Sequence, residues 1–321
     1  MTSIELAQAS NAAVYATMVS LSLAMVCFAI SFAVGRRRPA TVPARVEVLQ
    51  VAGSTDVIER PAAEPAEPVE PGRRAANIGM SLTWLSFFTL LVGVVLRGLW
   101  AGRVPWGNMY EFSITAALGI LGVFLALSTR RDLRWLGLFV VIPALLTLGL
   151  AVTVLYTEAA QLVPALKSYW LVIHVSAAII CSGAFTLAAA TAGLSLVRGR
   201  AERRAGGSPV TGWAARVPES AKLQVMTNRV VAFTFPLWTF AVVAGAIWAE
   251  NAWGRYWGWD PKETWAFITW VVFAAYLHAR STAGWRGDRA SWIVIAGWVA
   301  FMINYFGVNI FINSLHSYAG T

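Results

Sequence analysis

Residues 250–265 carry the densest group of chemically useful side chains in this sequence. The stretch reads Glu-Asn-Ala-Trp-Gly-Arg-Tyr-Trp-Gly-Trp-Asp-Pro-Lys-Glu-Thr-Trp, and five of its sixteen residues are aromatic. Apolar segments flank it on both sides. Trp and Tyr also gather at membrane interfaces in many proteins. An interfacial belt explains one or two of these rings, whereas five rings with interleaved glycines indicate a binding surface for a flat ligand.

The end of this stretch has the pattern of a helix start. Asp260 suits the N-cap, Pro261 suits the first helical position, and Glu263 stands where a capping-box partner belongs. The free N–H groups of a helix N-terminus favour anions. Arg255 and Lys262 add positive charge. A haem, with flat faces and anionic propionates, therefore fits this loop.

The sequence has only three histidines, and two of them can approach the loop. His174 lies near the start of an apolar run at 169–196, and His316 follows a run at 291–312. Two imidazoles on opposite faces of a porphyrin supply both axial ligands of a haem iron. We predict this role for His174 and His316; the alternative is a hydrogen bond from each ring to a neighbouring helix.

The third histidine lies far from the other two. His278 is 17 residues beyond Pro261, which is about 25 Å along a helix. It cannot share one haem with the other two. An ionisable residue in a membrane helix is a candidate functional residue. The alternative is an interface position beside Arg280.

The elements that position these residues are transmembrane helices. The chain is 58% hydrophobic and only 13% charged, which is typical of a polytopic membrane protein. The two cysteines, Cys27 and Cys181, stand in apolar runs and suit packing, and no motif for nucleic-acid binding occurs. We predict an all-α bundle of eight helices, from the apolar runs at 12–34, 80–100, 111–128, 135–155, 169–196, 230–249, 261–279 and 291–312.

Three regions follow from these runs. Residues 1–35 hold the first transmembrane helix, and the Pro/Glu/Ala-rich residues 36–77 are predicted to form a disordered cytoplasmic linker. Residues 78–321 form a seven-helix domain that carries the outer tryptophan-rich loop 250–265. No internal repeat is visible.

The distribution of Arg and Lys predicts the orientation. Most of the 25 cluster in 36–77, 129–134, 197–229 and 280–289, which are therefore expected in the cytoplasm. Both termini and the loop 250–265, the aromatic loop, then face outward. The other side holds only Arg97, Arg103, Lys167, Arg255 and Lys262. Abundant Arg and Ala with scarce Lys favour a bacterial plasma membrane.

The loop residues Trp253, Gly254, Trp257, Trp259 and Asp260 resemble the tryptophan-rich (WWD) signature of a haem-handling family of cytochrome c assembly proteins. With the three placed histidines, the chain resembles the CcsA/ResC-type subunit, called CcsB in some bacteria, of the System II cytochrome c synthase. The resemblance covers roughly residues 80–321. Trp265 completes the haem loop that it implies.

The resemblance implies a haem-protein synthase of the holocytochrome c synthase (lyase) type. This chain would carry haem b across the membrane and present it for thioether attachment to an apocytochrome c Cys-x-x-Cys-His motif. Whether this chain alone is an enzyme stays open. The resemblance also implies a ResB-type membrane partner, which would supply the ligand opposite His278.

Two further outer-side features carry alternatives. Pro105–Glu111 resembles the family's Pro-x-x-Asn-x-Tyr-Glu element, and either packs beneath the haem loop or forms a turn with belt residues. Arg97 and Arg103 either contact propionates or snorkel to the interface. Asn304, Asn309 and Asn313 suit interhelical hydrogen bonds better than ligation.

Two other functions remain compatible with the sequence. One is a haem transporter or chaperone that performs no coupling. The other is a b-haem electron-transfer subunit, which would place two histidines on facing helices at matched depth. That second function leaves the large aromatic loop unexplained.

The charge distribution predicts a labelling pattern. A single cysteine at position 255 should react with a membrane-impermeant thiol reagent added outside intact cells, whereas one at position 60 or 204 should not. The measurement is labelling before and after the membrane is permeabilised, in a background without Cys27 and Cys181. The reverse pattern would place the aromatic loop in the wrong compartment for the function proposed here.

Overall fold

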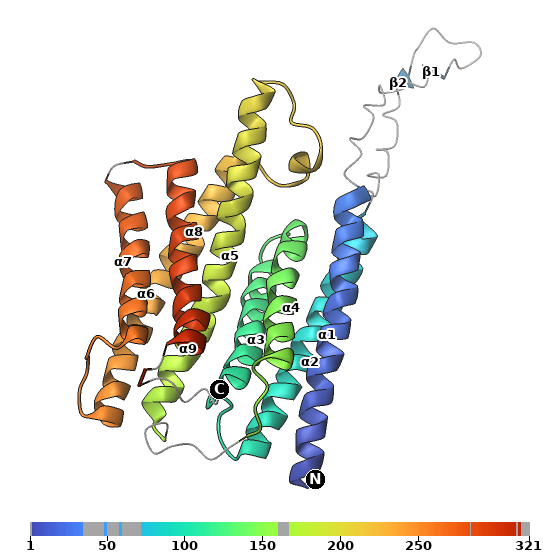
Figure 1. The fold of residues 1–321 in the computed structure, drawn as a ribbon. Coiled ribbons are helices and arrows are strands. Elements are labelled where there is room, and N and C mark those ends of the chain that lie inside the picture. Colours follow the sequence, from blue (N-terminus) through green and yellow to red (C-terminus); the bar gives the residue numbers. More distant parts are fainter. Residues whose placement is uncertain are drawn as a thin grey trace.

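The computed structural model describes residues 2–34, 48–49, 58–59, 72–159, 167–282, 284–312 and 314–315. Long antiparallel helices make up nearly all of this part of the chain (Figure 1). The elements in chain order are α1 (Ser3–Val34), β1 (Val48–Leu49), β2 (Ile58–Glu59), α2 (Arg73–Ala101), α3 (Met109–Ser128), η1 (Arg134–Leu136), α4 (Gly137–Thr153), α5 (Tyr169–Ala205), η3 (Trp213–Arg216), α6 (Ser220–Trp253), α7 (Pro261–Ser281), α8 (Asp288–Met302), η4 (Ile303–Gly307) and α9 (Val308–Phe311).

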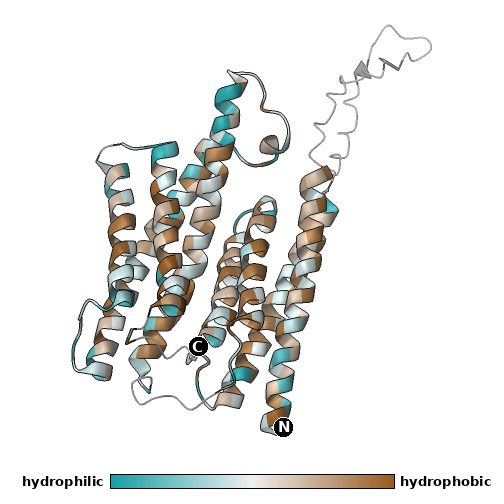
Figure 2. Ribbon diagram, viewed as in Figure 1, coloured by the Kyte–Doolittle hydropathy of each residue, from teal (hydrophilic) through white to brown (hydrophobic). Residues whose placement is uncertain are grey.

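The predicted all-α membrane bundle is confirmed. Within the described part of the chain, seven helical segments are long and apolar enough to cross a bilayer, by length and composition. The eighth predicted span, α7, has 21 residues but falls outside that set, because it starts with Pro-Lys-Glu and ends with His-Ala-Arg-Ser. Hydrophobic residues predominate along the middle of the bundle, and hydrophilic residues gather toward its two ends (Figure 2).

Several helices are longer than their apolar runs. α2 starts at Arg73, α5 continues to Ala205 and α6 starts at Ser220. Polar helix-forming residues extend these helices beyond their apolar runs, and tertiary contacts brace them. Glu202 pairs with Arg198 at 2.8 Å and accepts the backbone N–H of Ser220 at 3.1 Å.

Two predicted regions differ in other ways. The expected span 291–312 is one helical rod whose third quarter, η4, is a π-helix. Within the expected linker 36–77, the two-residue strands β1 and β2 pair antiparallel, with Val48 opposite Glu59. The rest of that linker up to residue 71 lies outside the described residues.

The helices alternate in direction, so their connections gather at two ends (Figure 1). One end holds the start of α1, the α2–α3 loop, the start of α5, the α6–α7 loop 254–260 and α9; we call it the aromatic end. The other, the basic end, holds the α3–α4, α5–α6 and α7–α8 connections. Each of the three basic-end connections carries arginines, as the charge pattern predicts. Which end faces the cytoplasm remains a prediction.

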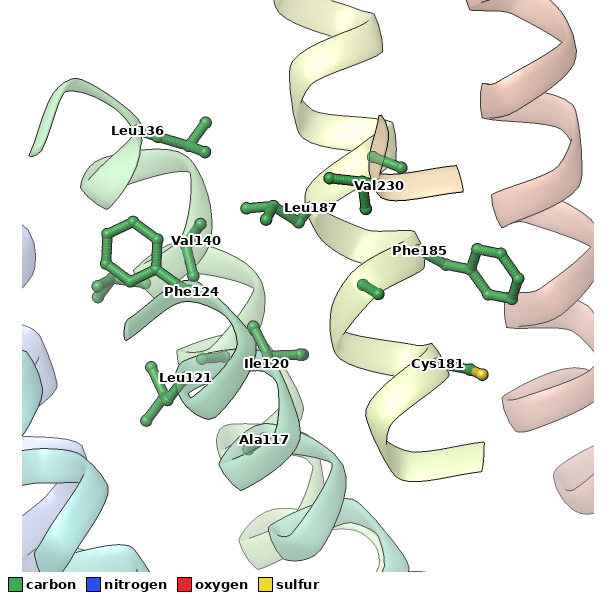
Figure 3. Packing of buried hydrophobic residues seen from close by; sticks show 14 of the residues in the cluster. Ala117, Ile120, Leu121, Phe124, Leu136, Val140, Cys181, Phe185, Leu187 and Val230 are labelled. Carbon is green, nitrogen blue, oxygen red and sulfur yellow. The ribbon is translucent and has the colours of Figure 1, made fainter. Parts of the chain in front are cut away.

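Glycines let α3 and α5 approach closely at the centre of the bundle. A Cβ on Gly183 would lie 2.5 Å from the Gly119 carbonyl oxygen, and one on Gly119 would lie 2.7 Å from the Ile179 carbonyl oxygen. Close backbone approach through small residues is the usual way that membrane helices pack. Around this contact, α3 contributes Ala117 and Ile120, and the Phe185 ring of α5 points away from α3 (Figure 3).

Phe185 joins α5 to the last helices. Its ring stacks on Phe273 of α7 at 4.1 Å between centroids and lies 5.6 Å from Phe301 of α8. Gly297 of α8 leaves room for Phe273, because a Cβ there would lie 2.8 Å from that ring. α5 is therefore the central helix against which both halves of the bundle pack, and it also carries His174.

The α3–α5 contact predicts unequal effects of two similar substitutions on α5. Gly183→Ala should lower the thermal midpoint of the purified protein in detergent by several degrees, because overpacking costs about 1–3 kcal/mol. Gly193→Ala should leave it unchanged or raise it slightly, since no atom lies within 4 Å of a Cβ at that position. Equal midpoints for the two variants would contradict the close approach.

Candidate functional site

A cavity of about 170 Å³ opens among the helices at the aromatic end. Its walls are mostly apolar and aromatic. Five segments of the chain contribute to it: 106–112, 171–178, 238–249, 256–266 and 301–309. Representative lining residues are Trp106 and Asn108 (α2–α3 loop), Phe112 (α3), His174 and Val175 (α5), Trp238 and Trp248 (α6), Tyr256 and Trp257 (α6–α7 loop), Lys262 and Ala266 (α7), Phe301 (α8), and Asn304, Tyr305 and Asn309 (η4 and α9). An apolar cavity with a few polar groups is the usual form of a small-molecule site.

His174 stands in the wall of this cavity with a defined ring orientation. Its Nδ1 lies 2.7 Å from the carbonyl oxygen of Ala241 on α6. A carbonyl oxygen only accepts hydrogen bonds, so Nδ1 carries the proton and Nε2 is the electron-pair donor of the neutral ring. Metal-binding histidines commonly use this arrangement.

Two residues of α6 make room for that ring and support it. A Cβ at Gly245 would lie 2.8 Å from both Cε1 and Nδ1 of His174, so any larger residue would displace the imidazole. The Trp248 ring lies parallel to it, with centroids 6.3 Å apart and planes 9° apart. Gly245 and Trp248 carry no sequence motif, and only the packing of α5 on α6 identifies them.

Some residues of the aromatic loop line the cavity, and others pack against the residues that line it. Trp257 and Tyr256 line the cavity. Trp253 ends α6 and packs edge-on against Trp248 at 4.9 Å, and Gly254 turns the chain with a φ of 69°. The structure therefore brings these loop residues together, and Tyr256, one of the five aromatic rings but not part of the tryptophan-rich signature, lines the cavity with Trp257.

Two other predicted loop residues stand apart from the cavity wall. Trp259 is 64% exposed and has a φ of 57°, a left-handed conformation that is uncommon for a residue with a side chain. Its ring meets Trp257 edge-on at 5.7 Å. Trp265 lies in the first turns of α7, half-buried. Strained backbone of this kind persists only where neighbouring contacts hold it.

The buried carboxylate of Glu263 holds the loop against α7. Its Oε2 accepts the backbone N–H of Gly258 at 2.8 Å and that of Asp260 at 3.0 Å, which completes the predicted capping box. The Arg255 guanidinium lies 3.4 Å from Glu263 Oε1. It crosses Gly258 so closely that a Cβ there would collide with it.

Asp260 joins this loop to the C-terminal segment. Its Oδ1 accepts the backbone N–H of Leu315 at 3.1 Å. His316 is the next residue in the sequence, and it lies outside the described residues. The last described residue before the second predicted ligand is therefore hydrogen-bonded to the aromatic loop.

The Pro105–Glu111 element lies at the same cavity as the aromatic loop, and its Trp106 and Asn108 line it. Asn108 caps α3 by accepting the N–H of Glu111 at 2.8 Å. Glu111 is fully buried and pairs with Arg97 at 3.1 Å and Arg103 at 2.6 Å. Neither arginine lines the cavity, whereas Lys262 does.

His278 lies at the other end of the bundle. It stands in the last turn of α7 near the basic end, and its side chain is exposed. About 25 Å of helix separates it from the start of α7 beside the cavity. The structure therefore separates His278 from His174, as the spacing predicts.

The last helix supplies polar groups to the cavity: two asparagines that the sequence suggested only for interhelical hydrogen bonds, and a tyrosine that it did not indicate. Asn304 and Tyr305 lie in the π-helix η4, and Asn309 follows in α9; all three line the cavity. π-Helical turns often occur at functional sites. Lys262 Nζ donates to the Asn304 backbone oxygen at 3.2 Å.

Comparisons with known proteins match this region of the chain. The family described as "Cytochrome C assembly protein" matches residues 106–316. The "Cytochrome c biogenesis protein CcsA" of Guillardia theta is 37% identical over an alignment of 256 residues, which covers 75% of this chain and 85% of that protein. The CcsA protein of Microcystis aeruginosa is 34% identical over 303 residues, with 80% of this chain and 90% of that protein covered.

A solved structure shares the fold. The structure titled "Cytochrome c Heme Lyase CcmF" superposes with a TM-score of 0.59 at 16% sequence identity. The match covers 95% of this chain and 47% of that one. At this identity the likeness concerns the fold of the helices.

The Asp260 contacts predict a coupled loosening of two segments. Asp260→Ala removes the helix cap, at a cost of about 1 kcal/mol, and the acceptor of the Leu315 N–H. Deuterium uptake should therefore rise both in peptides covering 254–262 and in those covering 312–315. Asp260→Asn keeps one side-chain oxygen in place of the two that accept the Lys262 and Leu315 N–H groups, so its uptake should lie between that of Asp260→Ala and that of wild type. Unchanged uptake at 312–315 in Asp260→Ala would show that this contact does not hold the segment.

Proposed function

Since the chain belongs to the cytochrome c assembly protein family, and is of the CcsA type, we propose that its aromatic-end cavity presents haem b to apocytochrome c. The protein is a multi-pass membrane protein with a role in cytochrome c maturation.

The observation that carries the proposal is the setting of His174. Its Nδ1–H is committed to the Ala241 carbonyl, so the ring presents Nε2 as the nitrogen suited to an iron ion. The ring stands in the wall of a cavity that Trp257 and Trp248 also line. Aromatic walls suit the faces of a porphyrin, and a histidine suits its iron.

His316 is proposed as the second axial ligand. The hydrogen bond from the Leu315 N–H to Asp260 supports this, because it brings the preceding residue to the loop. Lys262 is proposed to contact a propionate, since it is the one of the four predicted propionate contacts that lines the cavity. Arg255, paired with Glu263, is proposed to reinforce that positive edge. Arg97 and Arg103 would act through Glu111.

The proposed reaction needs no nucleophile from this chain. Each cysteine thiol of the apocytochrome Cys-x-x-Cys-His motif adds its S–H across one vinyl C=C bond, which forms a thioether. The histidines and loop would fix the position of the vinyl groups and limit access of water. Catalysis would then come from orientation.

His278 is proposed to serve a second haem position, at the inner side of the membrane. It is exposed at the basic end, far from the cavity, so another subunit could face it. Intramembrane imidazoles usually face protein because facing lipid is costly. A ResB-type subunit with its own membrane histidine is the proposed partner, in a System II synthase of a bacterial plasma membrane with the aromatic end outward.

The proposed ligation predicts a rescue experiment on the complex with its partner. His174→Gly should abolish thioether product on a Cys-x-x-Cys-His peptide and change the haem absorption spectrum. Added imidazole should restore part of both, because it can occupy the vacated axial position. Haem binding without thioether product in the wild type would instead indicate a transporter or chaperone.

A second pair of variants tests ring position without removing the ring. Gly245→Ala should lower haem occupancy several-fold, because its Cβ would lie 2.8 Å from the imidazole. Gly149→Ala is the matched control, since no atom lies within 4 Å of a Cβ there. Wild-type haem content in both His174→Gly and Gly245→Ala would refute the axial role.

A further inference from the structure

The two loops at the cavity each contain an arginine, an N-cap residue and a glutamate at the same relative positions, although no repeat is visible in the sequence. The α2–α3 loop has Arg103, Asn108 and Glu111. The α6–α7 loop has Arg255, Asp260 and Glu263. In each case the N-cap residue follows the arginine by five positions, and the glutamate follows it by eight.

The first loop, 103–111, makes a set of contacts around its glutamate. The Glu111 carboxylate accepts the backbone N–H of Gly107 at 2.8 Å. It pairs with the Arg103 guanidinium at 2.6 Å. The N-cap Asn108 accepts the N–H of Glu111 at 2.8 Å. A buried carboxylate thereby ties the loop backbone to the first turn of α3.

The second loop, 255–263, makes the corresponding contacts. Glu263 accepts the N–H of Gly258 at the same distance, 2.8 Å, and pairs with Arg255 at 3.4 Å. Asp260 caps α7. The loops differ in that Glu111 also pairs with Arg97, whereas Glu263 also accepts the N–H of its N-cap. Each loop also has a Trp-Gly pair, displaced by one position between the two.

Both braced loops present a tryptophan to the same cavity. Trp106 lines it from the first loop and Trp257 from the second, and His174 lines it from α5. If the first loop only shaped the backbone turn before α3, its Trp106 ring would not need to line the cavity. The braces fix the backbone that carries each ring, and holding a flat ligand requires such fixed walls.

A buried polar group of the cavity also indicates a ligand. The Asn304 side chain is only 6% exposed, and its Oδ1 has no hydrogen-bond partner among the described residues. It lines the same cavity as Lys262, whose Nζ donates to the Asn304 backbone oxygen at 3.2 Å. A buried acceptor without a partner is costly, so a bound molecule or water that donates to it would remove this cost.

We propose that residues 103–111 form a second ligand-holding arm, equivalent to the aromatic loop, with Trp106 contacting the bound ligand and Glu111 acting as its positioning residue. The ligand class is a flat, largely apolar molecule with polar edges, held by the two arms together. This inference rests on the proposed function, in which that molecule is haem.

The test measures the rate at which haem leaves the full-length, haem-loaded protein for excess apomyoglobin. Trp106→Ala and Glu111→Gln should each raise that rate about fivefold or more, as Trp257→Ala and Glu263→Gln should. The axial-ligand spectrum of the remaining haem should stay that of wild type, because His174 is untouched.

Glu202→Gln is the matched control. Glu202 also pairs with an arginine and accepts a backbone N–H, but it does so near the basic end of α5. It should leave the rate unchanged. Thermal midpoints of all variants separate loss of ligand contact from general loosening, and Trp106→Ala decides the question if Glu111→Gln does not fold.

Wild-type rates for Trp106→Ala and Glu111→Gln, with faster release from Trp257→Ala, would reduce the first loop to scaffold and leave the proposed function standing. If the wild-type protein, in which His174 is intact, retains no haem, both the proposed function and this inference are wrong.

Discussion

The carboxylate of Glu263, buried at the start of α7, is the contact on which the aromatic end depends. A loop at a membrane surface leaves backbone N–H groups that no helix satisfies, and unsatisfied groups are costly away from water. Glu263 accepts two of them and pairs with Arg255. This fixes the loop closely enough for Trp259 to keep a left-handed backbone and for Trp257 to line the cavity.

The same pairing explains how the aromatic end carries cations with little net charge. Arg97 and Arg103 share Glu111, and Arg255 pairs with Glu263. The positive charge on this end is therefore partly neutralised. Both glutamates also lie in the first turn of a helix, where negative charge is favourable.

Glycines determine how the imidazole meets the cavity. Gly119 and Gly183 bring α3 close to α5, and Gly245 lets α6 approach the His174 ring. The Ala241 carbonyl then receives the Nδ1 proton. A ligand position held by helix packing is more constrained than one on a loop, so the iron-binding nitrogen proposed here would be preorganised before any ligand arrives.

The sequence by itself determined the features that depend on local chemistry. Apolar runs predicted the helices, the order Asp-Pro-Lys-Glu predicted the capped start of α7, and the arginine distribution predicted a basic end. Only the tertiary structure decided which nitrogen of His174 is protonated, that Leu315 reaches Asp260, and that the loop ending at Glu111 lines the same cavity as the aromatic loop. These depend on contacts between residues tens to hundreds of positions apart, which hydropathy and helix propensity do not encode.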